Sequence, residues 1–169
     1  GSALALVSLG RVSVQRSDYA KADEVLTRAL MTQREIGHQS GLAATLTAMF
    51  VSHYARKDLA EAKTFIEGAL AIYRELNDRP GLATGLNNLG IVLNDQGNVT
   101  AARKAHEEAL AIRREIDNKP GVAMSLNNLA EVVAEEPDLA SARRLLEEAL
   151  QIGQEVGNKT RVSYTLTAL

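Results

Sequence analysis

The chain has 169 residues, of which 19 are Lys or Arg and 21 are Asp or Glu, giving a formal net charge of −2. This balance argues against a nucleic-acid-binding protein that relies on a basic face, because such proteins need clustered positive charge. The lack of cysteine excludes a disulfide scaffold, a thiolate metal site and a cysteine nucleophile. No apolar run reaches the roughly 18 residues of a membrane-spanning helix. We therefore expect a cytoplasmic protein without nucleic-acid or membrane partners.

The sequence repeats itself every 40 residues. A shift of 40 aligns Gly41, Gly81 and Gly121 without gaps. The repeats are 1–40, 41–80, 81–120 and 121–160, followed by a partial repeat at 161–169. Periods of this length are typical of arrays in which each repeat packs mainly on its neighbours. We therefore predict one all-α domain that spans residues 1–169.

Each repeat is predicted to contain two helices. In the third repeat the first helix is expected at about 81–95, because its leucines recur at helical spacing. The second helix begins after an Asx residue, a preferred N-cap. The four predicted caps are Asp18, Asp58, Asn98 and Asp138. The second helices are expected to end before Asn77-Asp78-Arg79-Pro80 and Asp117-Asn118-Lys119-Pro120, since proline disfavours α conformation in the preceding residue.

Small residues recur at two places in the second helices. One column contains Ala22, Ala62, Ala102 and Ala142, and the other contains Ala29, Ala69, Ala109 and Ala149. Small side chains let helix backbones approach, so both columns predict tight packing between helices. Phe50 departs from the pattern set by Gly10 and Gly90, and we expect it to separate helices locally or turn into a groove. Lys57 and Pro137 replace the turn residue Gly97.

The segment Leu86-Asn87-Asn88-Leu89-Gly90, followed by Gly97 and Ala109-Leu110, resembles the tetratricopeptide repeat. The fourth repeat carries the same pattern from Leu126 to Ala130. The 40-residue period resembles the longer variety in bacterial regulators, kinesin light chains and Pins-type scaffolds. This resemblance implies a right-handed α-solenoid of about four antiparallel helix pairs plus a terminal helix. It also implies a concave groove, lined by the first helices, that holds a peptide or a partner segment.

Two pairs of asparagines fall in the columns that the resemblance assigns to the groove: Asn87 with Asn88, and Asn127 with Asn128. An amide side chain offers both a donor and an acceptor, so it can bind the backbone of an extended peptide. The alternative is that these amides hydrogen-bond neighbouring helices. The other expected groove residues are Arg11, Thr47, Tyr54, Thr84, Ile91, Asn94, Met124 and Glu131.

The charge of the groove columns narrows the expected ligand. Arg11 is the only basic residue in them, which argues against the carboxylate clamp that some members of the resembled family use for chaperone tails. Glu131 and the acidic residues near it predict that the C-terminal part favours an apolar or basic peptide.

No other group of residues in the sequence predicts a catalytic or metal-binding site. His38, His53 and His106 lie at different places in their repeats, and we expect His53 and His106 to be structural. The basic pairs Arg113-Arg114 and Arg143-Arg144 are expected on the surface opposite glutamates. Without a nucleophile and base pair or a metal constellation, neither an enzyme nor a cofactor is predicted.

Two interpretations of function remain. The first is a non-catalytic peptide- or protein-binding module. The chain opens with Gly1-Ser2, and we expect it to be part of a larger bacterial regulatory, signalling or scaffolding protein. The second is a self-associating array that forms a homodimer through its terminal helix. The residues expected to form that contact are Tyr164, Leu166 and Leu169.

Overall fold

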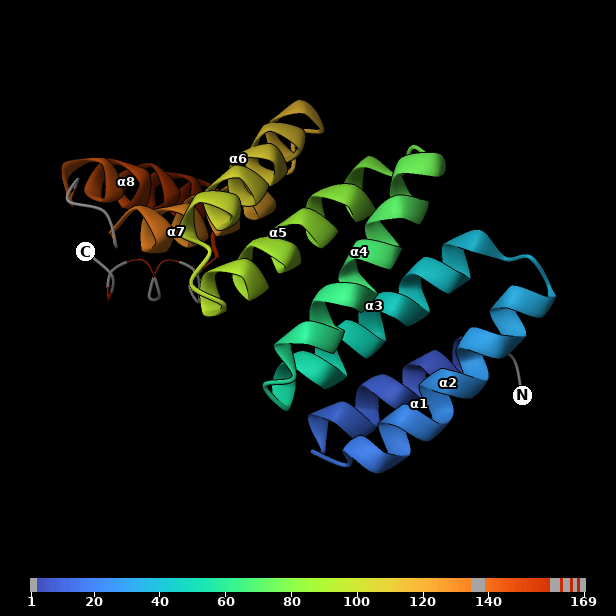
Figure 1. Cartoon of the computed structure of the whole chain (residues 1–169). Helices are drawn as coiled ribbons and strands as arrows, with labels where there is room; N and C mark the ends of the chain where they lie inside the picture. Colours follow the sequence, from blue (N-terminus) through green and yellow to red (C-terminus); the bar gives the residue numbers. More distant parts are fainter. Residues whose placement is uncertain (1–2, 135–138, 159–161, 163–164, 166, 168–169) are drawn as a thin grey trace. The chain divides into compact units, whose positions relative to one another are not determined.

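The computed structural model describes residues 3–134, 139–158, 162, 165 and 167. Within these residues the chain forms eight α-helices and no strand (Figure 1). The helices are α1 (Ala3–Gln15), α2 (Tyr19–Glu35), α3 (Gln39–Ala55), α4 (Leu59–Glu75), α5 (Arg79–Asp95), α6 (Val99–Glu115), α7 (Lys119–Ala134) and α8 (Leu139–Glu155). Among them, no helix has both the length and the hydropathy that a bilayer span requires.

The helices follow the predicted period. The first helices of the second, third and fourth repeats begin at residues 39, 79 and 119, and the second helices begin at 19, 59, 99 and 139. The prediction of an all-α fold built from repeated helix pairs is therefore confirmed. The chain divides into two compact parts, the N-terminal half (Gly1–Gly85) and the C-terminal half (Leu86–Leu169), and α5 contributes to both. One continuous domain over residues 1–169 stays a prediction.

Small residues hold the helices together within each half. In the N-terminal half α1 packs on α2 and on α3, α2 packs on α3, and α3 packs on α4. In the C-terminal half α6 packs on α7 and α7 packs on α8. All eight alanines of the two predicted columns are buried. Gly10 faces Leu26 so closely that a Cβ there would lie 2.5 Å from the leucine. Close backbone approach is therefore built into each helix pair.

The helix ends match the predicted caps and correct the predicted starts. Asp18, Asp58 and Asn98 each accept a hydrogen bond from the backbone N–H three residues on, as predicted. Asp138 lies outside the described residues. The second helices end where the sequence predicts, since α4 ends at Glu75 and α6 at Glu115, before the segments that contain Pro80 and Pro120. Each proline is the second residue of the next helix, where a proline is tolerated because the first-turn N–H groups have no helical partner.

The short turns between helices use left-handed backbone conformations. Gly37, Gly97 and Gly157 have φ angles of 66° to 76°, which glycine adopts without steric cost. Ser17 and Lys57, which occupy the position of Gly97 in the first two repeats, adopt φ angles of 58° and 62°, where a side chain is unfavourable. The substitution of Lys57 for the turn glycine therefore changes the residue without changing the conformation.

Exchanging residues at this turn position tests the strain. We expect Ser17→Gly to raise the free energy of unfolding by about 0.5–1 kcal/mol, because glycine removes the Cβ clash at positive φ. Gly97→Ser introduces the same clash in the third repeat and should lower stability by a similar amount. Chemical denaturation followed by circular dichroism measures both changes. Equal stabilities for all three proteins would contradict this account of the turns.

Candidate functional site

The N-terminal half contains a hollow of about 370 Å³ between α1 and α3. Its lining residues are Val7, Arg11, Val14, Gln15, Ala44, Thr47, Ala48, Val51 and Tyr73. Two predicted groove residues, Arg11 and Thr47, are therefore brought together on adjacent first helices. Most of the lining is aliphatic, and Arg11 is its only charged member. The first helices thus form a recessed surface of the size that binding pockets occupy.

Tyr73 comes from α4, a second helix, and was not predicted to reach the groove. Its hydroxyl lies 3.0 Å from Thr47 Oγ1. Thr47 Oγ1 donates its proton to the Ala43 carbonyl at 2.9 Å. A threonine hydroxyl has one proton, so Thr47 accepts the hydrogen bond that Tyr73 donates. This arrangement leaves the lone pairs of Tyr73 Oη as acceptors in the hollow.

Tyr73 belongs to a column of long polar side chains that pass the glycine eight residues further on. The pairs are Gln33 with Gly41, Tyr73 with Gly81, and Arg113 with Gly121. A Cβ on Gly81 would lie 2.5 Å from the tyrosine ring, and a Cβ on Gly121 would lie 2.9 Å from Arg113 Cδ. The aligned glycines therefore admit the side chain from the preceding second helix. The aligned glycines are visible in the sequence, but the residues that pass them are Gln, Tyr and Arg, so the repeat pattern does not reveal this column.

Arg113 organises the polar contacts of the C-terminal half. The prediction that it lies on the surface is wrong, because it is only 4% exposed. Its Nη1 donates to Ser125 Oγ at 2.8 Å, to the Gly121 carbonyl at 3.0 Å and to Asn87 Oδ1 at 3.3 Å. The open position at Gly121 lets the guanidinium reach α7 and α5. Arg113 thus fixes the orientation of Asn87.

The four predicted asparagines fall into two classes. Asn87 and Asn127 are buried, and each accepts a hydrogen bond from within the chain, so the structure places them away from an open groove. Asn127 Oδ1 accepts from Thr165 at 3.0 Å. Asn88 and Asn128 are half-buried. Asn128 Nδ2 donates to Asn87 Oδ1 at 3.0 Å, which orients its amide. Asn88 makes no side-chain hydrogen bond among the described residues.

The remaining predicted groove residues differ in exposure. In the C-terminal half, Ile91, Asn94 and Met124 are half-buried and Glu131 is exposed. In the N-terminal half, Thr84 is exposed and Tyr54 is half-buried. The predicted self-association residues Tyr164, Leu166 and Leu169 lie outside the described residues.

Phe50 and Tyr54 form an aromatic pair on α3. The rings stack with centroids 5.7 Å apart and an interplanar angle of 20°, and Phe50 is buried. Lys57 Nζ lies 5.3 Å from the centroid of the Tyr54 ring, so the cation also contacts this aromatic surface. Tyr54 is therefore held by stacking.

His106 is a buried structural residue. Its ring packs on Gly90, where a Cβ would lie 2.6 Å from the imidazole. Its Nδ1 is buried and has no hydrogen-bond partner among the residues that the structure describes. Burial, assisted by the positive charge of Arg113, lowers the pKa of His106 to about 4. The imidazole is therefore neutral at pH 7, and the structural role predicted for it fits this environment.

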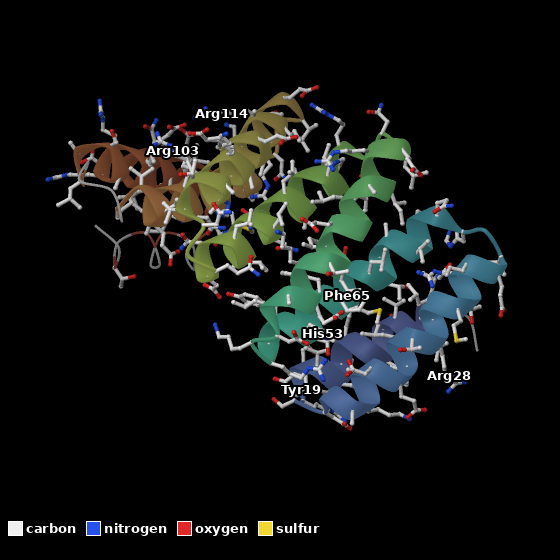
Figure 2. All side chains as sticks on the ribbon, in the orientation of Figure 1. Tyr19, Arg28, His53, Phe65, Arg103 and Arg114 are labelled. Carbon is white, nitrogen blue, oxygen red and sulfur yellow. The ribbon has the colours of Figure 1, made fainter. Side chains whose placement is uncertain are left out.

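His53 lies at the edge between α3 and α4, where it supports a turn. Its ring centroid is 4.9 Å from that of Phe65, and Figure 2 shows the two residues side by side. Its Nδ1 hydrogen-bonds Asp58 Oδ2 at 3.0 Å. This hydrogen bond holds the pKa of Asp58 below its usual value. Arg56 extends the cluster to Asp23 on α2, with an Nη1 to Oδ2 distance of 2.9 Å.

Charged residues elsewhere form surface pairs. Arg143 contacts Glu147 at 2.9 Å and Arg114 contacts Glu148 at 2.6 Å, as predicted for basic residues opposite glutamates. In the part of the chain that the structure describes, no group of three or more His, Cys, Asp or Glu residues could hold a metal ion.

The buried histidine predicts acid sensitivity. Its pKa falls from 6.5 in the unfolded chain to about 4 in the folded chain, so only the unfolded state binds a proton between these values. Protonation of His106 in the unfolded state does not affect stability above pH 6.5. As the pH falls to 4, it lowers the free energy of unfolding by about 3 kcal/mol. His106→Leu copies the Gly10–Leu26 pair and should remove this loss. Urea unfolding at pH 7, 5.5 and 4 compares the proteins, and equal slopes with pH would contradict the prediction.

The neighbouring asparagines provide a matched pair for a second prediction. Asn87→Ala removes a buried acceptor shared by Arg113 and Asn128, and we expect it to lower the free energy of unfolding by about 1–3 kcal/mol. Asn88→Ala should change it by less than about 0.5 kcal/mol, because no internal hydrogen bond is lost. Thermal and urea unfolding measure both. Similar losses at the two positions would contradict the division into buried and available amides.

Several solved structures share this fold. BtubC (BKLC) from P. vanneervenii matches with a TM-score of 0.85 and 24% identity over 94% of this chain and 67% of that chain. A Rap protein complexed with competence and sporulation factor matches with a TM-score of 0.86 and 15% identity over 95% of this chain. This chain spans 45% of that Rap protein. A putative kinesin light chain from Podosopora anserina matches with a TM-score of 0.74 and 18% identity, over 96% of this chain and 90% of that one.

Sequence comparison identifies the family. No curated protein matches the chain. One sequence model of the tetratricopeptide repeat matches residues 42–115 and 81–155, and a second matches residues 5–36. These matches cover most of the chain and contain both Asn-Asn segments together with Gly81 and Gly121. The chain therefore belongs to the tetratricopeptide repeat family.

Proposed function

We propose that the chain is a non-catalytic protein-interaction module that binds an extended peptide or partner segment on its first helices. The hollow between α1 and α3 carries the proposal. It combines aliphatic walls with a hydroxyl acceptor and a rim cation, and such mixed surfaces bind peptides through side-chain burial and a few oriented polar contacts. We also propose that the chain serves within a larger regulatory, signalling or scaffolding protein.

The C-terminal half supports the same proposal through side-chain amides in place of an aliphatic hollow. Asn88 and Asn128 are half-buried amides, and Asn128 is oriented by Asn87. An oriented amide can bind a peptide N–H and a carbonyl whatever the peptide's side chains are. Glu131 is exposed on α7, which favours an apolar or basic segment there. Binding of a peptide backbone by Asn88 and Asn128 is therefore part of the proposal.

The Rap protein structure supports a peptide or protein partner by analogy. That protein was crystallised with competence and sporulation factor. The shared fold supports a peptide or protein partner for this chain, while the low identity transfers no contact residue. The proposal for this chain therefore rests on its own hollow.

Self-association is a second candidate function, and one observation favours it. Leu9 and Val12 on α1 are 45% and 42% exposed. Met49 and Val132, which occupy the corresponding positions in the second and fourth repeats, are 7% and 1% exposed. Met49 packs in the cluster that contains α2, and Val132 packs against α6. A second copy could cover the exposed face of α1, because this face is normally a helix-packing surface.

Two exposed valines test whether peptides bind in the hollow: Val51 lines it, and Val12 lies on the other face of α1. We expect wild-type protein to enrich peptides from a random display library, and Val51→Lys to lose them because the lysine enters the hollow. Val51 is 44% exposed, so its replacement costs little of the core. Val12→Lys is the matched control, since Val12 is equally exposed but does not line the hollow. Its peptide enrichment should match that of wild type.

The outcomes separate the candidates. Equal enrichment by wild type and Val51→Lys would exclude the hollow as the binding site. An absence of enriched peptides, together with a dimer in sedimentation velocity that Leu9→Lys and Val12→Lys both abolish, would favour self-association. Circular dichroism confirms that each variant is folded.

A further inference from the structure

We propose that the hollow of the N-terminal half selects an acidic segment with one large aliphatic side chain. In this assignment the aliphatic side chain enters between α1 and α3. The backbone N–H of the same residue donates to Tyr73 Oη, and a carboxylate on the following residue contacts Arg11. The inference rests on the proposed function and specifies the ligand of that site.

The size and walls of the hollow set the first requirement. Its volume of about 370 Å³ is near the lower end of the roughly 300–1,000 Å³ of ligand pockets, so it suits a single anchoring residue with its backbone. Val7, Val14, Ala44, Ala48 and Val51 make its walls aliphatic. Burying an aliphatic side chain against these walls removes apolar surface from water on both partners.

The hydroxyl pair sets the second requirement. Thr47 uses its proton on the Ala43 carbonyl, and Tyr73 uses its proton on Thr47. Tyr73 Oη therefore accepts and does not donate. Gly81 and Gly85 leave room for the tyrosine ring, which holds this oxygen in place. A ligand must bring an N–H to this point, and a backbone amide beside the anchoring side chain supplies one.

Arg11 sets the third requirement. It is exposed on α1, and no carboxylate among the described residues lies within ion-pair distance of it. Its neighbours on the helix face, Val7, Val14 and Gln15, are uncharged, as are the α3 residues opposite. The guanidinium is therefore available to a ligand carboxylate. Because such a pair is exposed, it contributes about two- to fivefold in affinity and weakens with salt.

Competitive display tests the charge preference directly. Three libraries carry a fixed Leu-Glu, Leu-Gln or Leu-Lys pair between four random positions on each side. We expect wild type to enrich Leu-Glu about two- to fivefold over Leu-Gln, and Leu-Lys least. Arg11→Gln should remove the difference between Leu-Glu and Leu-Gln. Val12→Lys, the control on the other face of α1, should preserve the preference.

The hydrogen bond to Tyr73 is tested with the most enriched Leu-Glu peptide. N-methylation of its leucine removes the N–H, and we expect wild type to lose about three- to tenfold in affinity. Tyr73→Phe keeps the ring against Gly81 and removes the acceptor, so methylation should have a much smaller effect on this variant. Fluorescence polarisation at two salt concentrations measures both the methylation and the charge effects.

The outcomes distinguish this inference from the proposed function. Peptides that bind wild type and are lost with Val51→Lys, but that show no Leu-Glu preference and no sensitivity to Arg11→Gln, would overturn the inference and leave the proposed function standing. An absence of enrichment from all libraries, including the random one, would overturn both.

Discussion

The structure depends on the close passage of one side chain from each second helix past a glycine of the next first helix. Gln33, Tyr73 and Arg113 all take this path, and a Cβ on the glycine would collide with each of them. The passage does two things at once. It packs each second helix closely against the next first helix, and at Tyr73 it also brings a hydroxyl to the lining of the hollow, whereas Gln33 and Arg113 stay buried. At Tyr73 one side chain therefore serves both the packing of the helices and the lining of the hollow.

The two halves place different polar side chains at equivalent positions of the same helical scaffold. Tyr73 brings a hydroxyl to an aliphatic hollow, whereas Arg113 is buried and holds the amide of Asn87. The same position thus supplies a hydroxyl that lines the hollow in one half and a buried cation that supports Asn87 in the other. Around Tyr73 the rim carries a cation, while α7 carries an exposed glutamate. Each half has its own polar requirement, although the helices that display it are nearly equivalent.

Much of the fold could be predicted because its determinants are local and recur every 40 residues. The Asx caps, the alanine columns and the helix pairs each depend on residue type at fixed spacing. The candidate site was predicted less well, because exposure depends on neighbours in space. Asn87 and Asn88 are adjacent and identical in type, yet only Asn87 is reached by Arg113. Tyr73 and Arg113 escaped prediction because their column contains a different residue in every repeat.

The close contact between Tyr73 and Gly81 also bears on whether a single repeat can form a binding surface by itself. Since α1 belongs to the first repeat, and α3 and Tyr73 belong to the second, the lining of the hollow combines residues of two repeats. Gly81 receives Tyr73, and Gly121 receives Arg113. Exchanging whole repeats would therefore change which residues line a hollow where two repeats meet. Conversely, one substitution at Tyr73 on a second helix would change the surface that two first helices form, so this position is a direct place to engineer the hollow.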